Sequence, residues 1–328
     1  MNKAILNIIG LVSSIVLLFF ANLAWGSVSI PCRELLAIFF GSQPSPDTET
    51  FRYIVMESRL PQVMIALLSG AALSTSGLLL QTAFRNPLAG PDVFGISSGA
   101  GLAVAIVMLA FGGNFLSILL AAFIGAMLVL ALITLFSTIV RSNAVLLIIG
   151  LMVGYLASSA ISLLNFFSTA EGVKSYMIWG MGSFGNASMG EVRWFVPFAM
   201  LGLLSSLLLI KPLNAMLLDE QYAENLGVSI KKLRIALLVI TGVLTAVVTA
   251  FCGPIAFIGL ATPHIARLVI GTENHRRLLP VTMLMGSVLA LLCNLLCTLP
   301  ADGGIIPLNA VTPLFGAPVI IYVLIKKR

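Results

Sequence analysis

Apolar runs, each long enough to cross a bilayer, follow one another along almost the whole chain. A spanning α-helix needs about 20 predominantly apolar residues, and only short polar segments separate these runs. The predicted spans are Met1–Trp25, Leu60–Ala83, Val93–Phe111, Phe115–Ile139, Ala144–Phe167, Trp194–Ile210, Ile235–Phe251, Ile255–Ile270, Leu279–Leu299 and Val311–Ile325. They predict an all-α polytopic membrane protein in which residues 1–328 form a single transmembrane domain.

Composition supports this class and excludes several others. Charged residues make up 9% of the chain, against roughly 25% in a soluble domain, and mean hydropathy is +1.10. The basic residues are scattered over loops, which is not a nucleic-acid-binding pattern. The four cysteines lack the CxxC and CxxxH spacings of metal sites, so we expect neither a metal nor another cofactor.

The first apolar run has two interpretations. Lys3 followed by an apolar stretch and small residues near Gly26 fits a cleaved signal peptide. The run is also long enough to span, and Trp25 is typical of a membrane interface. We favour a retained helix.

The distribution of lysine and arginine predicts the orientation. Cytoplasmic loops of membrane proteins carry an excess of these residues. With a cytoplasmic N-terminus, thirteen of the 18 basic residues fall inside and five fall outside, the five being Arg33, Arg52, Arg59, Lys174 and Arg193. This places the polar insert Asn214–Arg234 in the cytoplasm.

That insert lies between two predicted spans, Trp194–Ile210 and Ile235–Phe251. Leu218, Tyr222 and Leu226 recur at i, i+4 and i+8, which predicts one apolar face on a short helix. Asp219, Glu220 and Glu224 lie on or near the other face. The pattern suits either an interfacial helix with solvated charges or a surface on which a soluble protein docks.

Signals for helix ends predict two short helices in the insert. Asn214 is a candidate N-cap and Gly227 a candidate C-terminal stop. Ser229 is placed to cap a second short helix, which would carry Lys231, Lys232 and Arg234.

Ionisable residues are almost absent from the predicted spans, whereas ion-coupled carriers usually need them there. The deep polar groups are hydroxyls and amides, including Ser158, Ser162 and Asn165. Gly154 and Ser158 belong to a small-residue ridge that serves close packing, a transport pathway or a dimer axis. If the chain is a transporter, we therefore expect its energy to come from a source outside the spanning helices rather than from ion coupling within them. A secondary transporter is the alternative.

A second alternative is an intramembrane serine protease. Gly95–Gly99 fits G-x-S-x-G, and His264 lies in another predicted helix as a partner for Ser97. In hydrolases this motif follows a strand, and no strand pattern precedes it here. We expect Ser97 and His264 to be structural. The chain has no P-loop motif, so we expect that it is not itself an ATPase.

Several motifs in fixed order carry a resemblance to a known family. They are Arg59-Leu60-Pro61, Gly70-Ala71-Ala72-Leu73, Arg85-Asn86-Pro87-Leu88-Ala89-Gly90-Pro91-Asp92, Trp179-Gly180-Met181-Gly182-Ser183, Gly253-Pro254-Ile255-Ala256-Phe257-Ile258-Gly259-Leu260, Pro263-His264-Ile265-Ala266-Arg267 and Gly316-Ala317-Pro318. With them the chain resembles the permease subunits of ABC importers for iron-siderophores, haem and cobalamin. The resemblance covers nearly the whole chain and identifies Gly95–Gly99 as a packing segment.

The resemblance implies ten helices per subunit and a homodimer around one central pathway in the bacterial cytoplasmic membrane. It also implies two cytoplasmic ATPase subunits and an extracytoplasmic substrate-binding protein. The family places its coupling helices between the sixth and seventh spans, where the insert Asn214–Arg234 lies.

The resemblance also assigns sites. ATPase coupling falls on Leu218, Asp219, Glu220, Tyr222, Ala223, Leu226, Gly227 and Val228. A cytoplasmic gate falls on Asn86, Pro87, Leu88, Ser142 and Asn143. The small-residue ridge and the deep polar groups, rather than the resemblance, are the reason that we expect Gly154, Ser158, Ser162 and Asn165 to line the translocation path. Arg59, helped by Arg52 and Arg193, is expected to dock the binding protein.

Two features qualify the resemblance. Relatives often carry an Asp and an Arg late in the ninth helix, where this chain has Asn294 and Thr298. The second docking arginine is therefore missing, and Ile305 replaces the glutamate of a Glu-x-Pro-x-Gly motif.

A short internal similarity between Gly90-Pro91-x-x-Phe94 and Gly253-Pro254-x-x-Phe257 suggests an inverted repeat.

Overall fold

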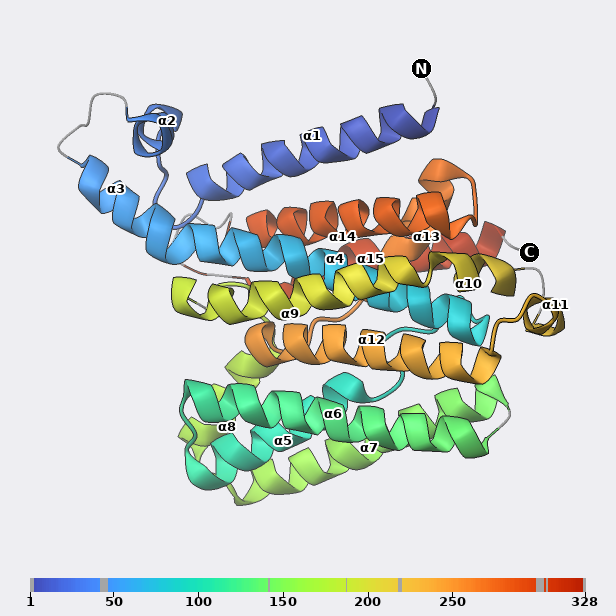
Figure 1. The fold of residues 1–328 in the computed structure, drawn as a ribbon. Helices are drawn as coiled ribbons and strands as arrows, with labels where there is room; N and C mark the ends of the chain where they lie inside the picture. The colour runs from blue at the N-terminus through green and yellow to red at the C-terminus, as the bar shows by residue number, and fades with distance from the viewer. Residues whose placement is uncertain are drawn as a thin grey trace.

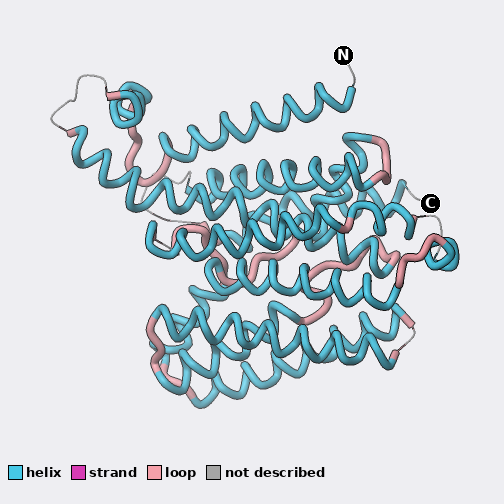
Figure 2. Tube along the Cα trace, viewed as in Figure 1, coloured by secondary structure: helices cyan, strands magenta, loops and turns pink. Residues whose placement is uncertain are grey.

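The computed structural model describes residues 3–41, 47–140, 142–186, 188–217, 220–298, 304 and 306–326. These residues form helices joined by loops, with no β-strand among them (Figure 2). The helices are α1 Lys3–Ala24, α2 Cys32–Phe40, α3 Thr48–Ile54, the π-helical turn η1 Val55–Arg59, α4 Leu60–Phe84, α5 Ile96–Phe111, α6 Phe115–Ile139, α7 Asn143–Phe167, α8 Ala170–Gly180, α9 Met189–Leu208, α10 Ile210–Met216, α11 Glu220–Asn225, α12 Ile230–Cys252, α13 Ile258–Ile270, α14 His275–Thr298 and α15 Leu308–Lys326.

The ten predicted spans are present. Within the described residues, seven helical stretches are long and apolar enough to cross a membrane, and α5, α13 and α15 are three shorter apolar helices. The second stretch runs unbroken from Thr48 to Phe84, because α3 and η1 continue into α4. The all-α polytopic fold predicted from the sequence is confirmed.

Helix α4 occupies the centre of the bundle. In its apolar stretch 83% of the residues are buried, against 17% for the peripheral α1. Glycines let other helices approach it closely: a Cβ on Gly70 would collide with the backbone of Gly286 in α14, and one on Gly77 with the backbone of Gly259 in α13. Small residues at crossings of this kind are how membrane helices pack without a hydrophobic driving force.

The bundle has two distinct ends (Figure 1). The N-terminus, the C-terminus, α10 and α11 lie at one end, which is the predicted cytoplasmic end. Helices α2, α3 and α8 lie at the opposite end. We refer to these as the inner and outer ends.

Two of the shorter spans begin after connections that fold back toward the bundle. Residues 85–95 precede α5, and residues 253–257 precede α13. Each connection ends in a residue with positive φ, Gly95 at 71° and Phe257 at 68°. This local likeness supports the inverted repeat, which stays a prediction.

Asn309, at the start of α15, fixes the second of these connections. Its Nδ2 donates to the carbonyl of Pro254 at 2.7 Å, and its Oδ1 accepts from the backbone N–H of Ala256 at 3.1 Å. The Asn309 side chain thus ties the start of α15 to the connection that precedes α13.

Two elements differ from the sequence prediction. Helix α8 was not predicted, because its polar residues resemble a loop. Helix α9 begins at Met189 rather than Trp194, since Ser188 and Glu191 form a capping box that adds a polar first turn.

Candidate functional site at the inner end

The insert Asn214–Arg234 contains the last residues of α10, the short α11 and the start of α12. Leu218 and Asp219 fall outside the described residues, as does the side chain of Glu220. Tyr222 and Leu226 are 49% and 60% exposed, whereas Ala223 is fully buried. Helix α11 therefore presents two apolar side chains that this chain alone does not cover.

Gly227 ends α11 as the sequence predicted. Its φ is +83°, and the backbone N–H of Val228 donates to the carbonyl of Ala223 at 3.0 Å. This is the bond pattern of a helix stop built on a left-handed residue. A Cβ at Gly227 would meet nothing within 4 Å, so glycine is needed there for its backbone conformation and not for space.

The predicted second short helix is wrong. Lys231, Lys232 and Arg234 lie in the first turns of α12, which continues without a break into the membrane span. Ser229 occupies the N-cap position but makes no side-chain capping hydrogen bond. A short loop therefore connects α11 directly to a spanning helix.

Asn214 is not the N-cap of the insert, since it lies inside α10. Its Oδ1 instead accepts the backbone N–H of His275 at 2.8 Å, and its Nδ2 donates to Oδ1 of Asn274 at 3.1 Å. The side chain thus caps α14 from a different helix, and this ties the insert to α14.

A second tie joins the insert to the central helix. The guanidinium of Arg85, just past α4, donates to the carbonyl of Met216 at 3.1 Å. Oγ1 of Thr82 and Nε2 of His275 lie 3.0 Å apart. The insert is therefore fastened to α4 and α14 together. Sequence reasoning missed Arg85, Asn274 and His275, whose polar character at helix ends was the available signal.

We expect Asn214→Ala to reduce transport several-fold in proteoliposomes while the protein still assembles. The substitution leaves the His275 N–H without its acceptor, and an unpaired buried donor costs about 1–3 kcal/mol of stability. It also removes the side-chain bonds that hold α10 to α14. Asn114→Ala is the matched control, because Asn114 caps α6 at the outer end through the N–H of Ser117 at 3.0 Å. Equal losses in both variants would show that the tie has no special part in transport.

The predicted gate residues lie on two connections at the inner end. Asn86 Oδ1 accepts the N–H of Leu88 at 2.9 Å, and the carbonyl of Pro87 lies 2.8 Å from Nε2 of His264 in α13. Ser142 caps α7 by accepting the N–H of Val145. Asn143 is the first residue of α7, and its side chain is outside the described set.

Ser97 and His264 are not arranged as a catalytic pair, because each side chain faces a different partner. Ser97 donates to Oδ1 of Asp92 at 3.1 Å, and His264 faces the carbonyl of Pro87. Both side chains fix the connection between α4 and α5.

We expect Ser97→Ala to keep transport within about twofold, since it removes one hydrogen bond worth roughly 1 kcal/mol. Gly99→Ala is the contrasting variant and should impair assembly, because its Cβ would lie 2.7 Å from the carbonyl oxygen of Gly125 and collide with Val129. Substrate uptake and monodispersity in detergent are the measurements. Complete loss of function in well-assembled Ser97→Ala would contradict a structural role.

Helix α7 carries the residues predicted to line the path. Gly154 faces Oγ of Ser98 in α5, so packing accounts for this position. Ser158 and Ser162 are exposed in the single chain, and Ser162 donates to the carbonyl of Ser158 at 2.9 Å. Asn165 is half-buried, and its Oδ1 has no partner in the described structure.

Arg59, which is predicted from the sequence to dock the binding protein, is buried within this chain. It is only 6% exposed. Its guanidinium donates to the carbonyls of Leu23 at 2.6 Å, Ala24 at 2.9 Å and Val28. Arg59 therefore closes the outer end of α1. Arg52 and Arg193 remain exposed at the outer end.

Asn294 belongs to a chain of hydrogen-bonded neutral amides. Gln62 Nε2 donates to Asn294 Oδ1 at 3.0 Å, and Asn294 Nδ2 donates to Asn22 Oδ1 at 2.8 Å. Asn22 in turn donates to the carbonyl of Leu291 at 3.1 Å. A continuous amide chain thus joins α4, α14 and α1.

Comparison with known proteins gives a consistent result along the full length. Residues 14–326 match the FecCD transport family. The chain is 36% identical over 301 residues to the vitamin B12 import system permease protein BtuC of Escherichia coli O127:H6, covering 90% of each sequence. The same protein of Vibrio parahaemolyticus serotype O3:K6 is 36% identical over 282 residues, covering 84% of this chain and 83% of the relative.

A solved structure agrees with these sequences. It is described as an inward-facing conformation of a metal-chelate type ABC transporter, and it matches with a TM-score of 0.85 at 32% identity, covering 98% of each chain. The shared features therefore extend over the helices as well as over the sequence motifs.

Proposed function

The chain belongs to the FecCD transport family, and from that premise we propose that it is the permease subunit of a binding-protein-dependent ABC importer for a metal chelate. It is a multi-pass protein of the bacterial cytoplasmic membrane, and its relatives are permeases rather than enzymes. Family membership sets aside the secondary transporter and the intramembrane protease.

The observation that carries the coupling proposal is helix α11. Its exposed Tyr222 and Leu226 form an apolar surface at the inner end, while Asn214 and Arg85 fasten the insert to α14 and α4. A surface of this kind suits a soluble partner, since aromatic and apolar anchors carry most of the energy of an interface. We propose that two separate ATPase subunits dock there and supply the energy.

A homodimer is proposed from α7. Only 22% of its apolar stretch is buried within the chain, and Ser158 and Ser162 lie on exposed positions. A second copy facing this helix would enclose a pathway lined by hydroxyls and amides. Such groups suit a large chelate that makes many weak polar contacts.

The outer end is proposed to receive the substrate-binding protein. Arg52 and Arg193 offer exposed positive charge there. The substrate is a cobalamin, an iron-siderophore or haem, and cobalamin is the first candidate because the relatives named above import vitamin B12.

The test is uptake by the reconstituted importer. The chain is co-expressed with an ATPase of the same operon, purified as a complex and placed in proteoliposomes with its binding protein and ATP. We expect a stable complex with two ATPases per two permease chains, and ATP-dependent uptake of one labelled chelate. A chain that purifies without any ATPase, or that transports equally without ATP, would overturn the proposal.

A further inference from the structure

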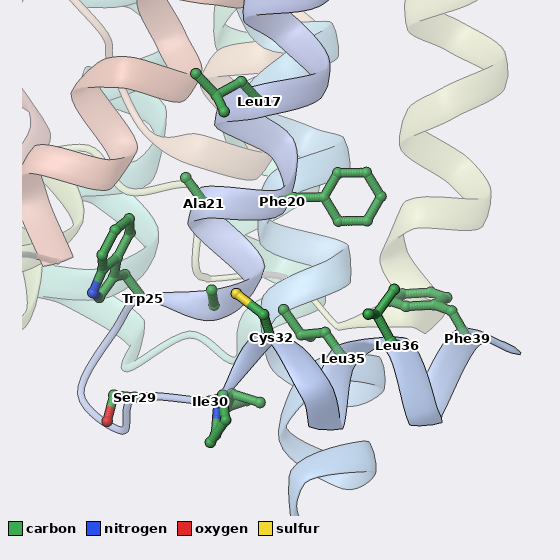
Figure 3. Close-up of a pocket in the computed structure, with 12 residues that line it drawn as sticks. Leu17, Phe20, Ala21, Trp25, Ser29, Ile30, Cys32, Leu35, Leu36 and Phe39 are labelled. Atoms are coloured by element: carbon green, nitrogen blue, oxygen red, sulfur yellow. The ribbon is translucent and has the colours of Figure 1, made fainter. Parts of the chain in front are cut away.

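An apolar groove of about 480 Å³ lies between the outer end of α1 and helix α2 (Figure 3). Side chains of α2, including Cys32 and Leu35, point toward α1 across it. Its lining is Leu17, Phe20, Ala21, Ala24, Trp25, Ser29, Ile30, Pro31, Cys32, Leu35, Leu36 and Phe39. None of these residues belongs to the coupling insert, the gate, the path or the exposed docking arginines.

The groove is held open by polar contacts on its outer side. Arg59 binds the carbonyls of Leu23, Ala24 and Val28, and so fixes the linker that leaves α1. On α2, Glu34 is buried and accepts the hydroxyl of Thr48 in α3 at 2.7 Å. Because α2 is fastened to α3 through this polar side, its apolar side is left facing α1.

The mouth of the groove is apolar and uncovered. Leu17 is 72% exposed and Trp25 59% exposed, and Leu36 is also open, whereas Ile30 and Leu35 form a buried floor. Leu17 lies within the membrane-spanning part of α1. Trp25 and the amphipathic α2 are typical of the interface between hydrocarbon and headgroups. The groove therefore opens sideways into the outer part of the bilayer.

The size and chemistry of the groove favour a hydrocarbon chain over a protein helix. A helix with its side chains is about 10–12 Å across and rises 5.4 Å per turn, so this volume would hold little more than one turn. Only Ser29, Cys32 and the Trp25 indole offer side-chain polar atoms, which suits a ligand without polar groups. Arg33, next to Cys32 on α2, is exposed and places a positive charge at headgroup level.

We propose that this groove binds one acyl chain of an outer-leaflet phospholipid, with the lipid phosphate near Arg33. The lipid fills the space between a peripheral span and the interfacial helix. It thereby becomes part of the outer end of the protein instead of exchanging freely with the bulk bilayer.

The first experiment uses photo-crosslinking of the full chain in nanodiscs. The probe is phosphatidylglycerol with a diazirine in the middle of one acyl chain, and crosslinked peptides are mapped by mass spectrometry. We expect crosslinks concentrated several-fold on α1 around Phe20 and on α2 around Phe39. Crosslinks spread evenly along the exposed face of α1, or on α1 alone, would overturn the proposal.

Two variants on α1 make a matched pair. Ala21→Trp fills the groove, whereas Val12→Trp adds the same indole at an exposed position of α1 outside it. We expect Ala21→Trp to lower the crosslinking at α2 at least fivefold and Val12→Trp to leave it unchanged. Arg33→Gln should lower it less, by weakening phosphate binding alone. Unchanged α2 crosslinking in well-folded Ala21→Trp contradicts occupation of this groove.

Cys32 gives an independent measurement, because it is exposed while Cys252, Cys293 and Cys297 are buried. In detergent, a small maleimide should alkylate Cys32 selectively. Added phosphatidylglycerol should slow this reaction several-fold in the wild type. In Ala21→Trp, where the groove is already filled, the lipid should not change the rate. A rate that is insensitive to lipid in the wild type would refute the proposed occupancy.

Discussion

Gly227→Val is expected to uncouple ATP hydrolysis from transport while the protein still inserts and assembles. Valine at a φ of +83° is strained by about 1–3 kcal/mol, and the end of α11 must shift to relieve it. No neighbour lies within 4 Å of a Cβ at this position, so the strain acts on the bend itself. We expect uptake to fall at least tenfold with ATPase activity retained, both measured on the reconstituted importer.

The matched control is Gly112→Val at the outer end. Gly112 has a φ of +63°, ends α5, and would also place a Cβ in open space. The backbone cost is therefore similar, but the site is far from the insert. We expect near-normal uptake in the control, and an intermediate loss for Gly227→Ala. Normal coupling in Gly227→Val would remove α11 from the path of energy transfer.

The arrangement of spans was predictable because membrane insertion is governed by the chain's own composition. Backbone N–H and C=O groups in the hydrocarbon of a bilayer must be paired with each other, so each long apolar run is stable there as an α-helix. Gly227 was predictable for a related local reason, since a helix stop with positive φ strongly favours glycine. Both properties depend on residues close together in the sequence.

Contacts between distant segments were not predictable in this way. Asn214 is a residue type that commonly caps helix N-termini, and it does cap one. The helix that it caps is α14, whose first residue lies 61 positions further along the chain. Arg59 looks like an exposed arginine because it borders a span, yet three carbonyls of the α1 end surround it. Which partner a polar group finds is decided by tertiary packing, and a single sequence does not record it.

The mistaken second helix of the insert has a different cause. Lys231, Lys232 and Arg234 interrupt the hydropathy pattern, so the predicted span began at Ile235. The structure starts α12 at Ile230, because lysine and arginine are good helix formers and a span continues past the membrane boundary into water. Polarity marks where the bilayer ends, not where the helix ends.

The outer end yields the prediction that separates folding from docking. Arg59→Glu should prevent correct assembly, since a carboxylate would face the carbonyl oxygens of Leu23, Ala24 and Val28. Breaking a buried charged contact costs about 3–5 kcal/mol. We expect aggregated or poorly expressed protein, and partial rescue in Arg59→Lys, which restores the positive charge with fewer donors.

Arg52→Glu and Arg193→Glu should assemble normally, because both side chains are exposed. If they pair with acidic residues of a binding protein, each reversal should weaken association by roughly 2–5 kcal/mol where the pair is partly desolvated, and by less at the rim. The measurement is the affinity for the binding protein in nanodiscs as salt is raised. The wild type should lose affinity faster than the double variant that carries both Arg52→Glu and Arg193→Glu. Lys174→Glu, an exposed charge on α8 that we do not assign to docking, controls for net charge.

If the double variant binds as tightly as the wild type at low salt, these arginines are not the docking surface. If Arg59→Glu assembles well and loses only binding, the buried contact that we see at the end of α1 must open when the partner docks.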